Sequence, residues 1–294
     1  MSNPENEVRI GVLGGSGLYA MDELTEIEER RVSTPFGEPS DTITIGSLRG
    51  VRVAFLPRHG RGHRLLPSEI PARANIYALK SLGVRWLLAA SAVGSMKEEI
   101  EPLHMVIPDQ LIDRTRGRIG TFFGGGIVGH VSLAEPFCPT LSALLADAAG
   151  RAGATVHRGG TYVCIEGPQF STKAESLLFR SWGVSIIGMT ALPEARLARE
   201  AEMHYAMIAQ STDYDCWHES EEAVTADMVV ANVAKNIATV RRSLLELAPT
   251  IPAELEDACT SALAHAIQTA PEAIVPEAAD RLGLIYEKYR SRTS

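Results

Sequence analysis

The chain has 294 residues, 45% of them hydrophobic and 22% charged, which is enough apolar material for a sizeable core and argues against intrinsic disorder. Its 36 acidic and 28 basic residues give a formal net charge of -8, and the basic residues form no block along the chain. Nucleic acid and anionic membrane surfaces are therefore not expected as partners.

The first half of the chain is predicted to be rich in short strands. Residues 1–9 are polar and acidic, unlike a signal peptide, and no later apolar run is long enough to cross a bilayer. Apolar patterning predicts strands over 8–13, 42–45, 51–56, 84–90 and 105–107, and a helix over 72–82. The turn between the second and third of these strands, 46–50, begins and ends with glycine and predicts a hairpin.

The second half is predicted to alternate helices with strands. Residues 116–129 are Gly-rich and are expected to form a mobile loop. Periodicity predicts helices over 139–152, 173–182, 193–202 and 227–247, and strands over 162–165, 184–187 and 203–209. This alternation indicates an α/β fold, a single domain in which helices flank a central mixed β-sheet. We expect the catalytic unit over 8–248 and, over 249–294, a C-terminal extension of the same domain with about two helical segments.

The cysteines give no sign of a metal site or a disulfide. Cys138, Cys164, Cys216 and Cys259 are widely spaced and form no CxxC pair. We therefore expect no metal ligands among them, and a cytoplasmic protein whose thiols stay reduced.

Two carboxylates, Asp213 and Asp215, follow the predicted strand 203–209. The C-terminal end of a strand is where open α/β sheets bind ligands. Two acceptors one residue apart suit a partner with two neighbouring proton-bearing nitrogens, such as the N7 and 6-amino edge of an adenine. A solvated loop is the alternative, and the pair taken alone does not decide between the two.

Two further segments after strands suit an anion. Residues 14–17, Gly-Gly-Ser-Gly, let backbone N–H groups approach a phosphate, and the Ser16 hydroxyl adds a donor. Residues 57–64 hold three Arg and two His, among them Arg58 and His59, and the Arg fork suits phosphate. The glycines also match a dinucleotide-binding pattern, but weakly, because a hairpin follows where a crossover helix is needed. A plain turn and a solvated basic loop are the alternatives.

Three more strand ends carry small or polar residues. Residues 89–95 are expected to form a small-residue turn that brings Ser91 to the same anion. Phe170 follows another strand and could stack on a planar ligand, with a core position as the alternative. Thr190 follows a fifth strand and supplies a hydroxyl. These three and the two anion-binding segments make five strand ends apart from the carboxylate pair, and together they argue for one shared cleft more strongly than any single motif.

Taken together, these segments resemble the trimeric purine nucleoside phosphorylase family, in particular the branch that cleaves 5'-methylthioadenosine. The resemblance runs from about Ile10 to Leu247 and rests on five motifs, which are 14–17, 57–60, 134–139, 165–171 and 212–217.

The resemblance implies a role for each group of residues. Those that would hold phosphate are Ser16, Arg58, His59, Ser91, Ala92 and Thr190. Asp213 would bond N7 of the purine and Asp215 its 6-amino group, while Phe170 would stack on the ring. Met189 would contact the ribose. Ala226 is small at a position that lines the 5' pocket in relatives, so specificity at this end would be broader than methylthio.

The implied reaction is phosphorolysis of 5'-methylthioadenosine to adenine and 5-methylthioribose 1-phosphate, with orthophosphate as co-substrate and no cofactor. Asp213 would act as a general acid at N7. A 6-oxopurine nucleoside or 5'-methylthioinosine phosphorylase is the first alternative, yet a 6-oxopurine relative would have Asn in place of Asp213 and an acid in place of Ser171. The other two alternatives are a nucleosidase, which would use water in place of phosphate, and a nucleotide-binding protein.

The resemblance also implies a homotrimer in which the segment 130–137 reaches into a neighbour's site. His130 and Phe137 would then help to cover the 5'-methylthio group. From the residues alone, His130 would be an ordinary surface histidine.

Overall fold

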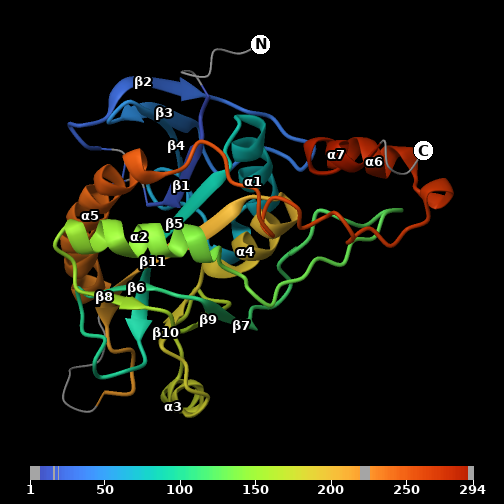
Figure 1. The fold of residues 1–294 in the computed structure, drawn as a ribbon. Helices are drawn as coiled ribbons and strands as arrows, with labels where there is room; N and C mark the ends of the chain where they lie inside the picture. The colour runs from blue at the N-terminus through green and yellow to red at the C-terminus, as the bar shows by residue number, and fades with distance from the viewer. Residues whose placement is uncertain (1–6, 16, 19, 219–225, 291–294) are drawn as a thin grey trace.

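The strands of this chain pair into one 11-stranded mixed sheet whose centre is parallel (Figure 1). The computed structural model describes residues 7–15, 17–18, 20–218 and 226–290. The parallel strands, from one side to the other, are β4 (Val51–Pro57), β1 (Ile10–Gly14), β5 (Trp86–Ser95) and β11 (His204–Asp213). Every residue of β1 and β11 is buried, as expected of strands that helices cover on both faces. The predicted α/β fold with a mixed sheet is confirmed.

The sheet edge beyond β4 is antiparallel. β3 (Ile43–Leu48) and β4 form the predicted hairpin, and β2 (Thr25–Arg30) pairs with β3 outside it. No strand was predicted over β2, because its residues are mostly charged. The charges mark an exposed edge strand instead, where they discourage pairing with other chains.

The sheet divides at β5. Along one edge of β5, β1 pairs as far as Ala89, and β10 (Ile186–Gly188) begins at Gly94. β10 leads on to β9 (Thr161–Ile165) and β7 (Gln110–Arg114), while β11 on the other edge leads to β6 (Met105–Ile107) and β8 (Val156–Arg158). The predicted turn over 89–95 was wrong, because these small residues continue the strand. Within the described chain, no strand pairs with residues 90–93 on the β1 side, which leaves an opening in the sheet.

Helices cover both faces of the sheet. Alternate residues of β5 point to opposite sides, so Leu88 packs with α2 (Pro139–Arg151) and α5 (Ala226–Leu247), and Leu87 packs with α1 (Ala72–Ser81) and α4 (Ala191–Glu200). A further helix, α3 (Lys173–Ser181), follows β9, and a capping box of Thr172 and Glu175 starts it. These helices lie within two residues of the predicted ends. None of the helices in the described ranges has the length and hydropathy needed to cross a bilayer.

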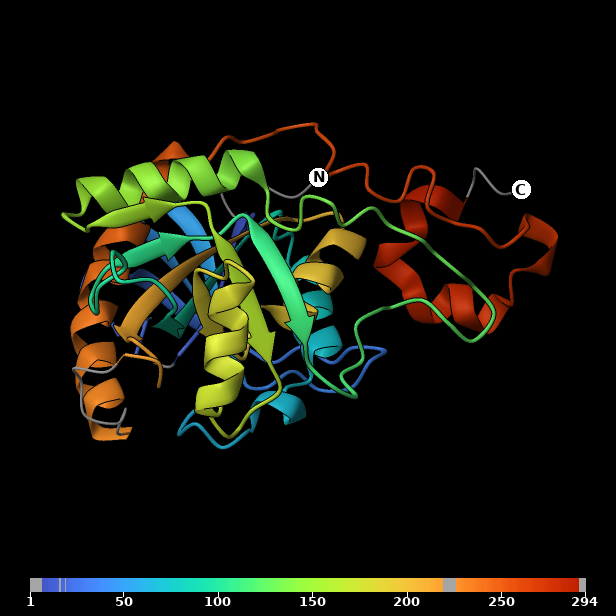
Figure 2. The ribbon, with the colours of Figure 1, turned by 90° about the horizontal axis from the view of Figure 1, so that it is seen from below.

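Residues 266–290 lie beside the Gly-rich segment 116–129, away from the sheet (Figure 2). Backbone bonds join the two, since His130 donates to Ala266 at 2.8 Å and Gln268 donates to Val128 at 2.9 Å. The predicted two helical segments correspond to α6 (Pro276–Leu282) and α7 (Glu287–Arg290), with short 3-10 turns at Ala248–Thr250, Pro271–Ala273 and Gly283–Ile285. A 3-10 turn also lies at Pro67–Glu69.

Candidate active site

A cavity of about 560 Å³ lies at the opening beside β5. It is bordered by the C-terminal ends of β1, β4, β9, β10 and β11 and by residues 90–94 of β5. These include all the strand ends that the sequence singled out, although the predicted end at 89–95 lies within β5. Ten of the predicted site residues line it: Arg58, His59, Ser91, Ala92, Phe170, Ser171, Met189, Thr190, Asp213 and Asp215. The expectation of one shared cleft is therefore confirmed. Ser16 lies outside the described residues.

Arg58 is held at one end of the cavity by a buried ion pair. Its side chain is 2% exposed, and its Nε and Nη2 atoms donate to the two carboxylate oxygens of Glu194 at 2.5 and 3.0 Å. Nη1 donates to the carbonyl of Ala90 and Nη2 also donates to that of Leu13. These bonds use four of the five guanidinium N–H groups, so Arg58 offers an anion its positive charge and one further donor.

His59 is neutral in this site. Its Nδ1 lies 2.8 Å from the carbonyl oxygen of Leu65, so Nδ1 carries a proton and donates it. Burial, together with the nearby guanidinium of Arg58, lowers the pKa of the imidazole to about 4. The remaining nitrogen, Nε2, is therefore an acceptor at neutral pH. It suits an anion that still bears a proton, such as a hydrogen phosphate, better than one that bears none.

Two hydroxyl groups lie between the anion end and the rest of the cavity. Ser91 Oγ and Thr190 Oγ1 are 2.9 Å apart, and both residues are buried. Ser91 Oγ also donates to the carbonyl oxygen of Ala92 at 3.2 Å, so Thr190 donates to Ser91, and a bound anion would take one of these two protons in place of its present acceptor. With Arg58 and backbone groups of Gly15 and Ala92 on the same wall, this end favours a small oxyanion.

Asp213 is fixed at the opposite end of the opening. Its Oδ2 accepts from Thr212 Oγ1 at 2.6 Å, and its Oδ1 accepts from the backbone N–H of Asp215 at 2.8 Å. The pairing of β11 with β5 shifts register between Ser211 and Asp213, a bulge that redirects the last side chain of the strand. Asp213 consequently lies opposite Gly94, where an added Cβ would be 3.1 Å from its Oδ1.

Asp215 is oriented by Ser171. The Ser171 hydroxyl lies 3.0 and 2.8 Å from the two carboxylate oxygens of Asp215 and donates to them. The backbone of Asp215 has φ +53°, a left-handed conformation that non-glycine residues seldom adopt. The turn therefore brings the second carboxylate back to the same cavity as Asp213, as the sequence predicted.

The cavity has one exposed aromatic wall. Phe170 is 59% exposed although it is large and apolar, so the alternative of a core position was wrong. Met189 also lines the cavity, and its side chain packs closely against the backbone of Gly167, since a Cβ there would meet Met189 Sδ at 2.5 Å. Val233 and Ile237 of α5 add apolar surface. Such a wall suits a planar ring with an apolar substituent.

Sequence reasoning missed the residues that hold this site together. Glu194 is one of these residues. The signal in the sequence that could have identified it is that it is the only acidic residue in the mostly apolar stretch 191–198. Arg118 is another, since it donates to the carbonyls of Met189 and Leu192 at 2.7 and 2.8 Å and ties the Gly-rich segment to the cavity rim. Gln210, a polar residue inside an apolar strand, is 5% exposed and lines the cavity.

Three predicted residues are not placed in the cavity of this chain. His130 is exposed and absent from the cavity wall. Phe137 is 2% exposed and stacks on Tyr205 with ring centres 5.7 Å apart, so the expectation that it covers a neighbour's ligand was wrong. It fills the core of its own chain. Ala226 begins α5 directly after the undescribed residues 219–225, and its side chain lies outside the described part.

The chain is similar to known proteins along nearly its whole length. A family model, the phosphorylase superfamily, matches residues 9–248. The S-methyl-5'-thioadenosine phosphorylase of Geobacter sulfurreducens is 56% identical over 281 residues, which are 95% of this chain and 98% of that protein. The crystal structure of a methylthioadenosine phosphorylase from an antarctic soil metagenomic library has a TM-score of 0.91 at 50% identity, covering 95% of this chain and 99% of that one. A mutant adenosine/methylthioadenosine phosphorylase of Schistosoma mansoni, solved with methylthioadenosine, has a TM-score of 0.80 at 39% identity and covers 87% and 95%.

Proposed function

The chain belongs to the phosphorylase superfamily and, within it, to the methylthioadenosine phosphorylases, and from this premise we infer that it converts 5'-methylthioadenosine and phosphate to adenine and 5-methylthioribose 1-phosphate. The observation that carries the inference for this chain is the two-ended cavity. Arg58, Ser91 and Thr190 form a cationic, hydroxyl-lined end, and Asp213 and Asp215 form an acidic end, with an apolar wall between them.

The acidic end supports recognition of an aminopurine. We propose that Asp213 hydrogen-bonds N7 of the base and that Asp215 accepts a hydrogen bond from the 6-amino group, while Phe170 stacks on the ring. A 6-oxo group at the same place would face an unpaired carboxylate, which costs several kcal/mol at most sites. Ser171 turns Asp215 toward the base and carries no charge of its own.

Bond cleavage needs a proton and a negative charge in the right places. As the glycosidic bond breaks, electrons move onto the purine, and we propose that Asp213 delivers or holds the proton that N7 gains. The anomeric carbon becomes cationic, and phosphate at the Arg58 end lies against its face and then bonds to it. Phosphate is thus both the stabilising charge and the nucleophile. In this scheme orthophosphate is a co-substrate, and the steps use no cofactor.

The apolar wall supports a 5'-thioether at the sugar end. Met189, Val233 and Ile237 offer no charged partner to a 5' substituent, so an uncharged group is favoured over a 5'-phosphate. We propose that Met189 contacts the ribose and that Ala226 and His130 belong to the 5' end in the assembled protein.

The assembly and the tail are part of the proposal. We propose a homotrimer in which residues 8–248 form the catalytic unit and residues 249–294 extend the same domain. Cys259 and Leu263 of the tail are buried, each in a different half of the core, and this supports placing residues 249–294 in the same domain as the catalytic unit. We also propose that the protein acts in the cytoplasm, which the four free thiols support.

Product analysis tests the reaction. Purified protein is incubated with methylthioadenosine with and without phosphate, and the products are separated by chromatography. We expect adenine and methylthioribose 1-phosphate only with phosphate. Equal adenine release without phosphate would indicate a nucleosidase, and faster cleavage of inosine than of methylthioadenosine would indicate a 6-oxopurine enzyme.

A further inference from the structure

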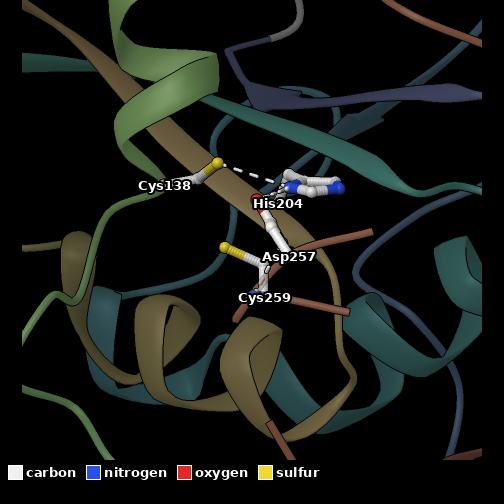
Figure 3. Close-up of side chains that lie close together, drawn as sticks. All are labelled: Cys138, His204, Asp257 and Cys259. Carbon is white, nitrogen blue, oxygen red and sulfur yellow. Dashed lines mark hydrogen bonds and ion pairs between the residues drawn. The ribbon is translucent and has the colours of Figure 1, made fainter. Parts of the chain in front are cut away.

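Four side chains that are far apart in sequence converge outside the cavity (Figure 3). They are Cys138, His204, Asp257 and Cys259, and one potential ligand atom of each lies within 4.8 Å of those of the other three. Cys138 is the N-cap of α2, His204 is the first residue of β11, and the other two belong to the C-terminal tail. None of the four lines the cavity described above.

Two of the separations are close to those between the ligands of one tetrahedral ion, and the others are no more than 4.8 Å. Cys138 Sγ lies 3.3 Å from His204 Nδ1, and His204 Nδ1 lies 3.6 Å from Asp257 Oδ2. Bond lengths typical of zinc sites place sulfur, nitrogen and oxygen ligands about 3.4–3.8 Å apart. Small movements of the side chains are therefore enough to close the four groups on one ion.

The side chains are held in this arrangement by their own surroundings. The ring of His204 stacks on Trp86 with centres 4.0 Å apart and planes 15° apart, which directs Nδ1 toward the cysteines. Asp257 Oδ1 accepts from the backbone N–H of Cys259 at 2.7 Å, which leaves Oδ2 facing the histidine. Cys138, His204 and Cys259 are each no more than 3% exposed, and Asp257 is partly exposed and gives an ion a way in.

The charges of the cluster suit a divalent cation. Two thiolates and one carboxylate carry three negative charges, and the Arg199 guanidinium donates to Cys259 Sγ from 3.5 Å. The single positive charge of Arg199 and the two positive charges of a divalent ion together balance the three negative charges of the ligands. Two sulfur ligands and an imidazole favour zinc over magnesium or calcium, which prefer oxygen.

We propose that Cys138, His204, Asp257 and Cys259 bind one zinc ion that fastens the C-terminal tail to α2 and β11. With four protein ligands the site is closed, which is the form of a structural rather than a catalytic zinc site. The sequence reading found no metal ligands because the spacing 138, 204, 257 and 259 has no local pattern. Only the fold brings the four together.

The first experiment measures metal content. The full chain is expressed in zinc-supplemented medium, freed of any affinity tag, and analysed by inductively coupled plasma mass spectrometry. We expect about one zinc per chain in the wild type. Cys138→Ser and Cys259→Ser should each bind zinc at least about tenfold more weakly, whereas Cys164→Ser, which removes a buried cysteine elsewhere, should keep its zinc.

The second experiment uses cobalt as a spectroscopic probe and chelation as a stability probe. Metal-depleted, reduced protein titrated with Co²⁺ should develop thiolate charge-transfer and tetrahedral d–d absorption, which is lost in both cysteine variants and kept in Cys164→Ser. Removing zinc with a chelator should lower the melting temperature on the order of 5 °C and speed proteolysis within 249–290, and zinc should reverse both changes.

Two results would overturn the proposal, and both remain decisive if a cysteine variant fails to fold. One is a wild-type protein without zinc that gives no cobalt absorption when reduced. The other is a Cys138–Cys259 disulfide in the purified protein whose reduction restores no metal binding, since the cluster would then be a thiol pair and not a zinc site.

Discussion

Single residues at the two ends of the cavity have separable roles. Asp213 and Asp215 are both acidic, yet Asp213 is buried at the end of a strand and bonded to Thr212, while Asp215 lies in a turn and is bonded to Ser171. His59 is a neutral imidazole whose free nitrogen accepts. These differences follow from burial and hydrogen bonding, so each residue can be tested by a substitution that preserves its shape.

Asp213→Asn should lower kcat for methylthioadenosine by about 10²–10⁴ at saturating phosphate. The amide keeps the size of the side chain but has no acidic proton to deliver or hold at N7. Adenine release measured by initial rates checks this. A kcat close to that of the wild type would remove Asp213 from the proposed proton transfer.

Asp215→Asn should instead relax the choice of base. Its amide can donate to a 6-oxo group, so the ratio of kcat/KM for adenosine to that for inosine should fall on the order of 100-fold. Ser171→Ala should weaken binding of methylthioadenosine without changing this preference. An unchanged ratio in Asp215→Asn would place the 6-position of the base elsewhere.

The lowered pKa of His59 makes folding sensitive to acid. Between pH 6.5 and about 4 the unfolded chain binds a proton that the folded chain does not, so the free energy of unfolding falls as the pH falls through this range. His59→Asn keeps a donor for Leu65 and should flatten this part of the pH dependence. Denaturant unfolding at pH 7 and pH 5 measures it, with His265→Asn, which changes an exposed histidine elsewhere, as the control. Equal slopes in the wild type and His59→Asn would contradict the assignment.

At the scale of the elements, the site depends on contacts between segments that are distant in sequence, and no local sequence pattern predicts these contacts. The periodicity of the chain was sufficient to predict the helices and the buried strands. A buried strand gives a short continuous apolar run, and an amphipathic helix gives apolar residues three or four positions apart. The continuation of β5 through 90–95 was not predictable, because small residues there read as a turn. Glu194 and Gln210 were missed for a related reason, since a buried polar residue is explained by its partner or ligand, which the sequence does not show.

The Arg58–Glu194 ion pair joins α4 to the end of β4, and its loss should lower the free energy of unfolding strongly. Glu194→Gln leaves a buried guanidinium without its counter-charge, and we expect the free energy of unfolding to fall by about 3–5 kcal/mol. Glu246→Gln, which breaks two exposed ion pairs, should cost less than about 1 kcal/mol. Denaturant unfolding compares the two. Added phosphate should restore part of the loss in Glu194→Gln, because it supplies the missing negative charge.

At the scale of the whole molecule, the tail and the Gly-rich segment form one projection beside the sheet. Backbone bonds join 126–130 to 266–275, and the side chain of Arg281 donates to the carbonyl of Gly124 at 2.6 Å. The exposed His130 belongs to this projection, since its backbone N–H donates to the carbonyl of Ala266. An exposed, well-bonded projection that lines no site of its own chain is suited to contact a second chain.

We therefore expect a trimer in solution, with a mass near three times the 31.7 kDa of one chain by light scattering. His130→Ala should raise KM for methylthioadenosine more than KM for phosphate, because its proposed place is at the 5' end. Ser132→Ala, also exposed in the same segment, serves as the control. A monomer with full activity at assay concentration would show that the sites are not shared.

The opening beside β5 has a consequence for how this enzyme can change. Ser91 at the proposed phosphate end and Gly94, opposite Asp213 at the proposed purine end, belong to the same strand, roughly 10 Å apart along its axis. In the proposed scheme, one continuous backbone therefore sets the spacing between the two substrates. Deleting or inserting a single residue within 90–94 would alter that spacing and also turn every following side chain to the opposite face. Substitutions at the rim can accumulate and shift specificity, whereas the length of this strand segment is fixed by the reaction.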